Sequence, residues 1–254
     1  MKLTIKDNFP QVQRTIDALG KQARFAAAVA LTKTAQDIRS AEVRELQRAL
    51  DRPTPYTLRS LFLKPATKAS LEAKVWIKDD RAGSGTPAVR YLLPQIEGGE
   101  RSAKRFEQSL RLAGYLPPGW LAMPGAGARL DQYGNVSRGQ IIEVLSQLRI
   151  TIVSGFTRNM SFDSRKAIAA QRRAGGRYFA VRPGALTRLK PGIYQRELIG
   201  NNVSPVFVFV RGATYRKRVD FFGVAEKVAA QKFPGHFKAA IERALATQRV
   251  PPRG

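Results

Sequence analysis

The chain has 254 residues, which is enough for one large or two small domains, and its 43% of apolar residues predicts a folded core. Its 44 lysines and arginines against 19 acidic residues give a formal net charge of +25, which favours a polyanion or an acidic protein as a partner. The absence of cysteine excludes disulfides, cysteine nucleophiles and thiolate metal sites. No stretch reaches the roughly 20 apolar residues of a membrane span, and the N-terminus carries charges where a signal peptide needs an apolar run. We therefore expect a soluble protein made in a cytoplasm, or one built into a particle assembled there.

The first third of the chain predicts a strand, a long helix and two further strands. Residues 2–6 alternate polar and apolar side chains, as in a short strand. Apolar residues recur at helical spacing over residues 21–50, a helix about 45 Å long that needs packing along its length. Pro53 and Pro55 must end it. Residues 57–80 then predict strand, turn and strand, with Leu71, Ala73, Val75 and Ile77 on one face.

The middle of the chain is richer in loops. Residues 91–99 end at paired glycines and predict a short extended segment. Residues 101–113 predict a helix that Gly114 closes, with Phe106, Leu110 and Leu112 facing inward. Residues 114–136 contain many glycines and prolines, and a long irregular connection of this kind is often a contact loop.

The stretch 127–148 allows either a ligand site or a turn that starts a helix. Asp131 is its one early carboxylate, which is too few for a calcium loop, and the Lys-Ser or Lys-Thr pair of a phosphate loop is missing. The pair Gly134–Asn135 is typical of a turn, and Ser137 with Gln140 fits a helix-capping box. We therefore predict a turn followed by a helix at about 138–149.

The last hundred residues change in character twice. Residues 155–176 are polar and basic, with a possible helix from 164 to 174. Apolar runs at 177–181, 192–198 and 205–211 predict a three-stranded antiparallel meander. Residues 219–247 show helical spacing, and the Pro-Gly pair at 234–235 predicts a split into two helices.

Basic and aromatic residues are interleaved in this C-terminal region, which holds Arg172, Arg173, Arg177, Arg182, Arg188, Lys190, Arg196, Arg211, Arg216, Lys217 and Arg218, with Tyr178, Phe179, Tyr194 and Tyr215. A basic sheet with aromatic rings binds single-stranded nucleic acid through stacking and phosphate contacts. The same pattern suits a surface that meets an acidic protein, or that lies near packaged DNA without reading bases. The second interpretation is favoured because no specific recognition motif accompanies the pattern.

Three groups of residues are candidates for catalysis. Glu72 and Lys74, with Asp51 upstream, resemble the carboxylates and lysine of a metal-dependent nuclease, but charged residues on the wet face of a strand give the same spacing. His236 is the only histidine and lies at an expected helix start, where a surface or capping role is favoured. Glu97 and Glu100 flank paired glycines and fit acid–base chemistry, yet Glu100 also precedes a helix that it would stabilise. We therefore favour a protein that is not an enzyme, with no catalytic residue, cofactor or metal.

The order of the elements carries a resemblance to a known group of proteins, in the stretches AAAVALTKTAQDIRSAEVRELQ, RPTPYTLRSL, ASLEAKVWIKDD, YLLPQIEGGER and VAEKVAAQKFPGHFKAAIERAL. In these stretches the chain resembles tailed-phage minor tail and tail-completion proteins, the minor tail protein Z group and its neck-protein relatives. The similarity covers mainly residues 20–110 and 205–247. It implies a structural virion component, a ring or collar subunit at the head–tail junction or in the tail, without catalysis. The size of the chain and its 98–175 insertion depart from the group.

Together these patterns predict an α+β fold, in which a long N-terminal helix and C-terminal helices pack on an antiparallel sheet. We expect a single domain, residues 1–254, with a helical, loop-rich insertion at 98–175. Copies would join in a ring through the long helix and sheet edges, beside neighbouring tail, neck or portal proteins and in non-specific contact with DNA. Because aromatic and arginine side chains commonly anchor interfaces, the expected contact residues are Trp120, Tyr133, Arg172, Arg173, Arg216, Lys217 and Arg218.

A DNA-binding accessory protein and, less favoured, a metal-dependent nuclease remain the alternatives. The first predicts DNA binding that weakens steeply with salt. The second predicts cleavage that is lost in Glu72→Ala. The structural hypothesis instead predicts that the protein is found in virions, after assembly in the host cytoplasm.

Overall fold

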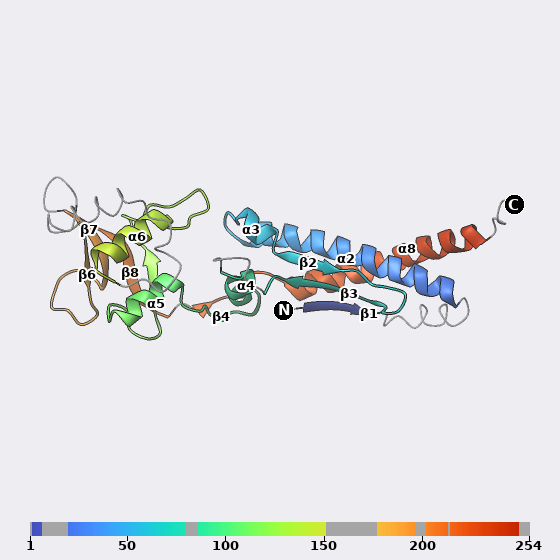
Figure 1. Ribbon diagram of the computed structural model, residues 1–254, viewed down its shortest axis with the longest axis horizontal. Helices are drawn as coiled ribbons and strands as arrows, with labels where there is room; N and C mark the ends of the chain where they lie inside the picture. Colours follow the sequence, from blue (N-terminus) through green and yellow to red (C-terminus); the bar gives the residue numbers. More distant parts are fainter. Residues whose placement is uncertain are drawn as a thin grey trace. The chain divides into compact units, whose positions relative to one another are not determined.

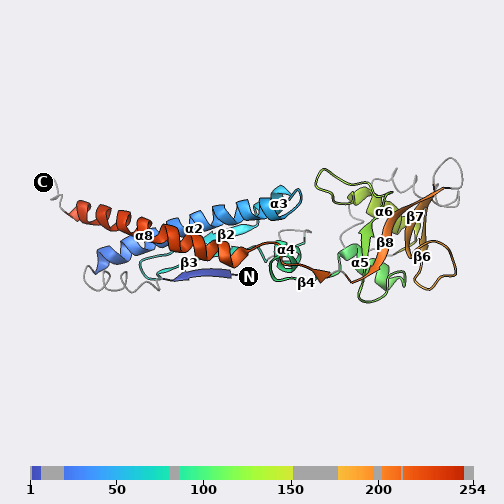
Figure 2. The ribbon, with the colours of Figure 1, turned by 180° about the vertical axis from the view of Figure 1, so that it is seen from behind.

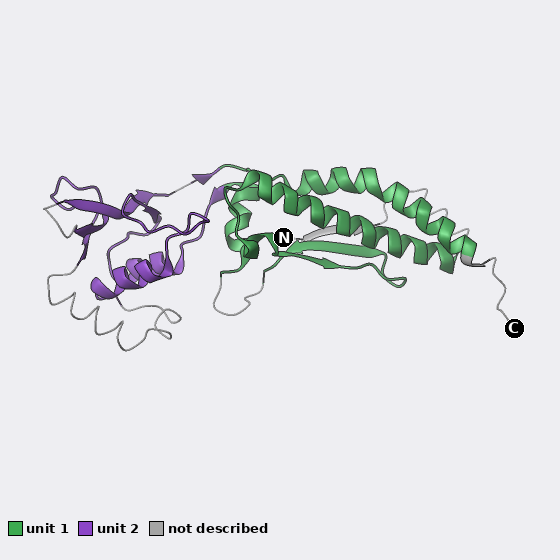
Figure 3. Ribbon diagram, turned by 90° about the horizontal axis from the view of Figure 1, so that it is seen from above, with its two compact units in different colours: residues 1–98, 216–254 green, residues 99–215 purple. Residues whose placement is uncertain are grey.

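A computed structural model of the chain describes residues 2–6, 20–79, 86–150, 177–196, 202–212 and 214–248. The fold is α+β, as predicted, and the chain divides into two compact units (Figure 3). Unit 1 contains residues 1–98 and 216–254, and unit 2 contains residues 99–215. The expected insertion covers residues 98–175. The corresponding unit of the structure begins at residue 99 and continues to 215, because the strands of the meander pack with the middle of the chain.

Unit 1 contains a three-stranded antiparallel sheet in the order β1-β3-β2. Its strands are β1 (Lys2–Lys6), β2 (Leu61–Lys64) and β3 (Glu72–Ile77). Every second residue of β3, beginning at Ala73, is buried, and the residues between are partly exposed. The predicted strands and the predicted buried face of β3 are confirmed.

Two long helices run antiparallel and side by side in unit 1, α2 (Lys21–Ala49) and α8 (Phe221–Gln248) (Figures 1 and 2). The buried side of α2 is rich in alanine, whose small side chain lets a second helix approach closely. The same side packs against β3 and against Phe233 of α8. Helix α2 ends before the two prolines as predicted, and the short α3 (Pro55–Leu58) begins at the second of them.

Residues 91–99 are not extended, so that prediction is wrong. They belong largely to α4 (Ala88–Glu97), which contains Pro94. Ala88, Leu92 and Ile96 lie four residues apart and are buried together, so one helix face joins the core of unit 1. This packing outweighs the backbone hydrogen bond that the proline removes.

The predicted break at Pro234 is also wrong, because α8 continues through it. Pro234 and Gly235 lie on the exposed side of the helix. Phe233 is buried before the proline, and Phe237 and Ile241 pack against the same cluster after it. A continuous apolar stripe therefore holds both halves of α8 against α2.

Unit 2 is built on a four-stranded antiparallel sheet in the order β5-β8-β7-β6. Its strands are β5 (Trp120–Pro124), β6 (Tyr178–Val181), β7 (Gly192–Arg196) and β8 (Val203–Arg211). The meander β6-β7-β8 is as predicted, whereas β5 lies in the stretch expected to be irregular. A further pair, β4 (Gly99–Glu100) and β9 (Thr214–Tyr215), joins the two ends of the unit.

Two helices contribute to the core of unit 2, α5 (Arg105–Leu112) and α6 (Arg138–Gln147). Their apolar side chains form one buried cluster with the inward side chains of β5 to β8, including Phe106 and Leu110, as predicted. The expectation that Leu112 faces inward is wrong, since 79% of it is exposed. Position 112 lies two residues beyond Leu110 and so points to another side of the helix.

Within the described part of the chain, no helix combines the length and the apolar character that crossing a membrane requires.

Candidate functional site

The residues predicted as contacts are distributed over both units. Trp120 begins β5, and the guanidinium carbon of Arg211 lies 5.5 Å from the centre of its ring. Tyr133 lies in the turn that precedes α6. Arg172 and Arg173 lie outside the described residues, as does the possible helix at 164–174.

The basic triplet 216–218 lies in unit 1, directly before α8. The backbone N–H groups of Arg218 and Val219 both donate to the carbonyl oxygen of Gln95, at 2.7 and 3.0 Å. The ammonium group of Lys217 lies 3.3 Å from the Asp220 carboxylate. This stretch is therefore a fixed connection between α4 and α8, and all three basic side chains remain exposed on it.

The loop before α6 is a turn and helix start, as predicted. One carboxylate oxygen of Asp131 accepts the backbone N–H groups of Tyr133 and Asn135, both at 2.9 Å. The Ser137 hydroxyl accepts the N–H of Gln140 at 3.3 Å and caps the helix. The Gln140 side chain does not complete the capping box, because it bonds the backbone at Gly127 and Arg129 instead.

Loss of this cap gives a modest, local prediction. Ser137→Ala is expected to lower the free energy of unfolding of unit 2 by about 1 kcal/mol, because one N–H of the first helical turn loses its acceptor. The chain has two tryptophans, Trp76 in unit 1 and Trp120 in unit 2, so denaturant unfolding in a Trp76→Phe background reports on unit 2. Ser102→Ala, at an exposed position outside the helices, is the control. Equal losses in the two variants would contradict the cap.

The residues of the nuclease hypothesis form ion pairs with neighbouring side chains. Glu72 and Lys74 pair with each other on β3 at 3.0 Å, and Asp51 pairs with its neighbour Arg52 at the same distance. Across the described residues no group of three or more His, Asp and Glu side chains is arranged to hold a metal ion. His236 bonds Asp37 at 2.7 Å and so links α8 to α2.

Two arginines lie over aromatic rings close to β6, which is an edge strand of the unit 2 sheet. The guanidinium carbon of Arg196 lies 4.8 Å from the centre of the Phe179 ring, and Phe179 stacks on Tyr194 with ring centres 5.7 Å apart. The guanidinium carbon of Arg182 lies 4.8 Å from the centre of the Tyr115 ring. We call this set, with Arg177, the arginine–aromatic edge.

Sheet register explains how these residues meet. Phe179 and Tyr194 are direct partners across β6 and β7, so their rings share a face. Two residue pairs further on, the N–H of Arg196 donates to the carbonyl oxygen of Arg177 at 2.8 Å, which places two arginines opposite each other. Like charges opposite each other disfavour the strand pairing. The register therefore brings two positively charged side chains to neighbouring positions at this edge of the sheet.

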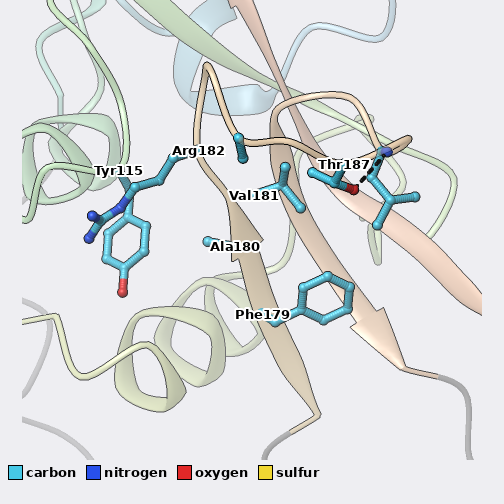
Figure 4. Close-up of a pocket in the computed structure, with 8 residues that line it drawn as sticks. Tyr115, Phe179, Ala180, Val181, Arg182 and Thr187 are labelled. Atoms are coloured by element: carbon cyan, nitrogen blue, oxygen red, sulfur yellow. Dashed lines mark hydrogen bonds between the residues drawn. The ribbon is translucent and has the colours of Figure 1, made fainter.

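An open hollow of about 510 Å³ lies around β6, lined by the edge residues Tyr115, Phe179 and Arg182 and by the β6–β7 loop. Figure 4 shows Arg182 beside Tyr115 on one side of the strand and Phe179 on the other. Ligand sites commonly span about 300–1,000 Å³, but this hollow faces solvent broadly. It suits part of an extended polymer better than an enclosed small molecule.

Sequence reasoning missed a buried ion pair that organises unit 2. The Glu107 carboxylate, 0% exposed, accepts two bonds from the Arg101 guanidinium at 2.6 and 2.7 Å. It also accepts the backbone N–H groups of Lys104 and Ala122 at 2.6 and 2.9 Å. Burial alone would raise the pKa of Glu107, but these four bonds outweigh it and lower the pKa. One carboxylate thus joins the start of α5 to β5.

A second buried carboxylate lies in unit 1. Glu42 of α2 is 0% exposed, and neither of its carboxylate oxygens has a hydrogen-bond partner. Burial, together with the nearby charges of Glu45 and Asp220, raises the pKa of Glu42 to about 8. Glu45 differs because Arg48 bonds both of its oxygens at 2.8 Å, which lowers the pKa of Glu45. Glu42 is thus a protonation-sensitive point on the buried side of α2.

Comparisons of the chain with protein-family models, with curated proteins and with solved structures found no match.

Proposed function

We propose that the chain is a structural subunit of a tailed-bacteriophage virion, placed in the tail or at the head–tail junction, where copies contact one another and neighbouring proteins near the DNA. The proposal starts from the sequence resemblance to tail-completion and minor tail proteins. In this role the protein is not an enzyme and uses no cofactor.

Uncovered aromatic side chains on unit 1 support this proposal most directly. Phe62 and Trp76 are direct partners on β2 and β3, with ring centres 5.7 Å apart. They lie on the face of the sheet opposite the buried side chains that pack on α2, and 38% of Phe62 is exposed. Phe25 and Phe222 of the long helices are also exposed. Aromatic side chains left in solvent are typical of surfaces that other subunits cover.

Mass spectrometry of gradient-purified virions tests the proposal. The chain is expected among the particle proteins at a fixed copy number, as a closed ring requires. In particles from a deletion strain supplied with Phe62→Ser, the copy number is expected to fall several-fold, because the aromatic contact is removed. Lys64→Ser, on the same face of the same strand, is the control and is expected to assemble normally. Absence of the wild-type chain from intact particles would end the virion proposal.

A further inference from the structure

We propose that the free side of β6, the side not paired with β7, binds an extended acidic segment of another protein, which adds to the unit 2 sheet as a further strand. Among the described strands β6 pairs only with β7, and so it ends the sheet. The inference deepens the proposed function, because it names the kind of neighbour that unit 2 contacts, and it rests on that function for the source of the segment.

The hydrogen-bonding pattern of the sheet directs the backbone of Ala180 to the free side of β6. The N–H of Phe209 on β8 donates to the carbonyl oxygen of Pro191 at 2.9 Å, so Ile193, two residues after Pro191, also faces β8. Ile193 is the partner of Ala180 across β6 and β7, and the two therefore form a pair without mutual hydrogen bonds. Within the described part of the chain, no group bonds the N–H or the C=O of Ala180. Such unpaired groups on an edge strand are a template for a further strand.

The hollow of about 510 Å³ follows the same side of β6. Side chains alternate between the two faces of a strand, yet Phe179 and Val181 from one face and Ala180 and Arg182 from the other all line this hollow (Figure 4). Because β7 occupies one side of β6, a hollow that both faces share must pass the free side. A strand added there would lie about 4.8 Å from β6, within the open space.

The lining of the hollow favours a peptide over a nucleic acid. Most of its side chains are apolar, with Ala185 and Leu189 of the β6–β7 loop joining those of β6. An extended peptide offers N–H and C=O groups to Ala180 and places alternate side chains against this apolar lining. A nucleic acid has no alternating amide donors and acceptors, so it would leave the free backbone groups of Ala180 unpaired.

The charge around the hollow selects an acidic segment. Arg182 lines the hollow, and the β6–β7 loop carries Arg188 and Lys190; all three side chains are exposed. Opposite charge on a partner speeds its encounter with such a surface and fixes its register. A second copy of the chain would bring the same cations to the pair, and its net charge of +25 would repel the first copy. An acidic strand from a different protein therefore fits better than self-pairing.

The test is fluorescence anisotropy of the full-length protein with a labelled peptide of alternating glutamate and valine. The wild-type protein is expected to bind this peptide. A peptide of the same sequence, N-methylated at every residue, keeps the charge and the side chains but has no backbone N–H groups. It is expected to bind at least about tenfold more weakly, because acceptors on β6 then remain unpaired.

Ala180→Pro makes the same test on the protein side. Proline removes the N–H that faces the free side and leaves the pairing with β7 intact, and edge strands tolerate it at such positions. The affinity for the unmethylated peptide is expected to fall at least about tenfold. The control is Leu186→Pro, at the centre of a turn that the Thr187 N–H closes on the Ala185 carbonyl at 2.9 Å, where proline fits. The control should change the affinity less than about twofold, since Leu186 does not line the hollow.

Arg182→Gln tests the charge preference. It is expected to weaken binding of the acidic peptide several-fold. Lys232→Gln removes the same charge from an exposed position on α8 and should have little effect. The methylated peptide needs no change in the protein, so a result remains even if a variant misfolds.

Four outcomes would overturn the inference. Equal affinities for the two peptides would mean that charge alone attracts the segment, and absence of binding at millimolar peptide would mean that β6 accepts no strand. Binding of oligothymidylate that is tighter than peptide binding and is lost in Ala180→Pro would make the site one for nucleic acid. A dimer of the wild-type chain that Ala180→Pro abolishes would make a second copy the occupant. Virion mass spectrometry answers separately for the proposed function, since a chain absent from particles can still bind the peptide.

Discussion

Glu107→Gln is expected to lower the free energy of unfolding of unit 2 by about 3–5 kcal/mol, the range for breaking a buried ion pair from one side. The substitution keeps the size of the side chain but removes its charge. Arg101, whose side chain is only 10% exposed, then loses the anion that balances it. Glutamine also has a single acceptor oxygen, so it cannot keep all four of the bonds that Glu107 accepts. The measurement is urea unfolding followed through Trp120 in a Trp76→Phe background.

Arg129→Gln is the matched control for this prediction. It breaks the Arg129–Glu143 pair of the same unit, whose side chains are 53% and 32% exposed. Exposed pairs of this kind contribute at most about 1 kcal/mol. A loss from Glu107→Gln no larger than the loss from Arg129→Gln would show that the buried pair does not organise unit 2.

The dependence of the stability of unit 2 on acidic pH follows from Glu107. The pKa of Glu107 is lower in the folded protein than its ordinary value of 4.5, so the folded state binds fewer protons than the unfolded chain. The stabilisation is therefore complete above about pH 4.5 and is lost as the pH falls through the folded pKa. In the glutamine variant this part of the acid sensitivity should disappear.

Unit 1 is expected to lose stability as the pH rises from about 5 to 8, which is the opposite dependence. The folded pKa of Glu42 is about 8 against an ordinary value of 4.5, so the unfolded chain ionises first. The stability that this group contributes is present in full below pH 4.5 and declines until the folded pKa is passed. At 1.36 kcal/mol for each unit of pKa, the total change reaches about 4–5 kcal/mol.

Glu42→Gln should flatten this pH profile, since glutamine does not ionise. The stability of the variant relative to wild type is expected to increase steadily with pH, whatever the fixed cost of burying an amide. Unfolding is followed through Trp76 in a Trp120→Phe background. Glu226→Gln, at an exposed position on α8, should leave the profile unchanged. Parallel profiles for wild type and Glu42→Gln would show that Glu42 does not carry the effect.

Much of the fold could be predicted because its signals are local. The apolar spacing of residues 21–50, the alternation in β3 and the apolar runs of the meander each lie within one segment. Two of the errors in secondary structure occurred at prolines. Pro94 and Pro234 lie inside helices because apolar residues on both sides of each proline pack on distant parts of unit 1. Sequence spacing contains no measure of that tertiary packing.

The candidate site depended on pairings that no single segment encodes. The arginine–aromatic edge arises from the register of β6 against β7 and from the approach of Tyr115, which lies far from both in sequence. Basic and aromatic interleaving signalled a charged surface, yet it gave no reason to choose Arg182 and Arg196 over Arg216 or Arg218. Glu107 was missed for a related reason, because Ala122, one of its donors, lies fifteen residues away.

The β4–β9 pair has a consequence for how such a chain can diversify. Gly99 and Tyr215 are direct strand partners, so unit 2 leaves unit 1 and returns to it at nearly the same point. Paired strands hold their α-carbons about 5 Å apart, which a short peptide link spans easily. A different domain whose two ends lie close together could therefore replace unit 2 without changes to unit 1. A gene could exchange the segment that encodes unit 2 and keep the two long helices of unit 1 intact.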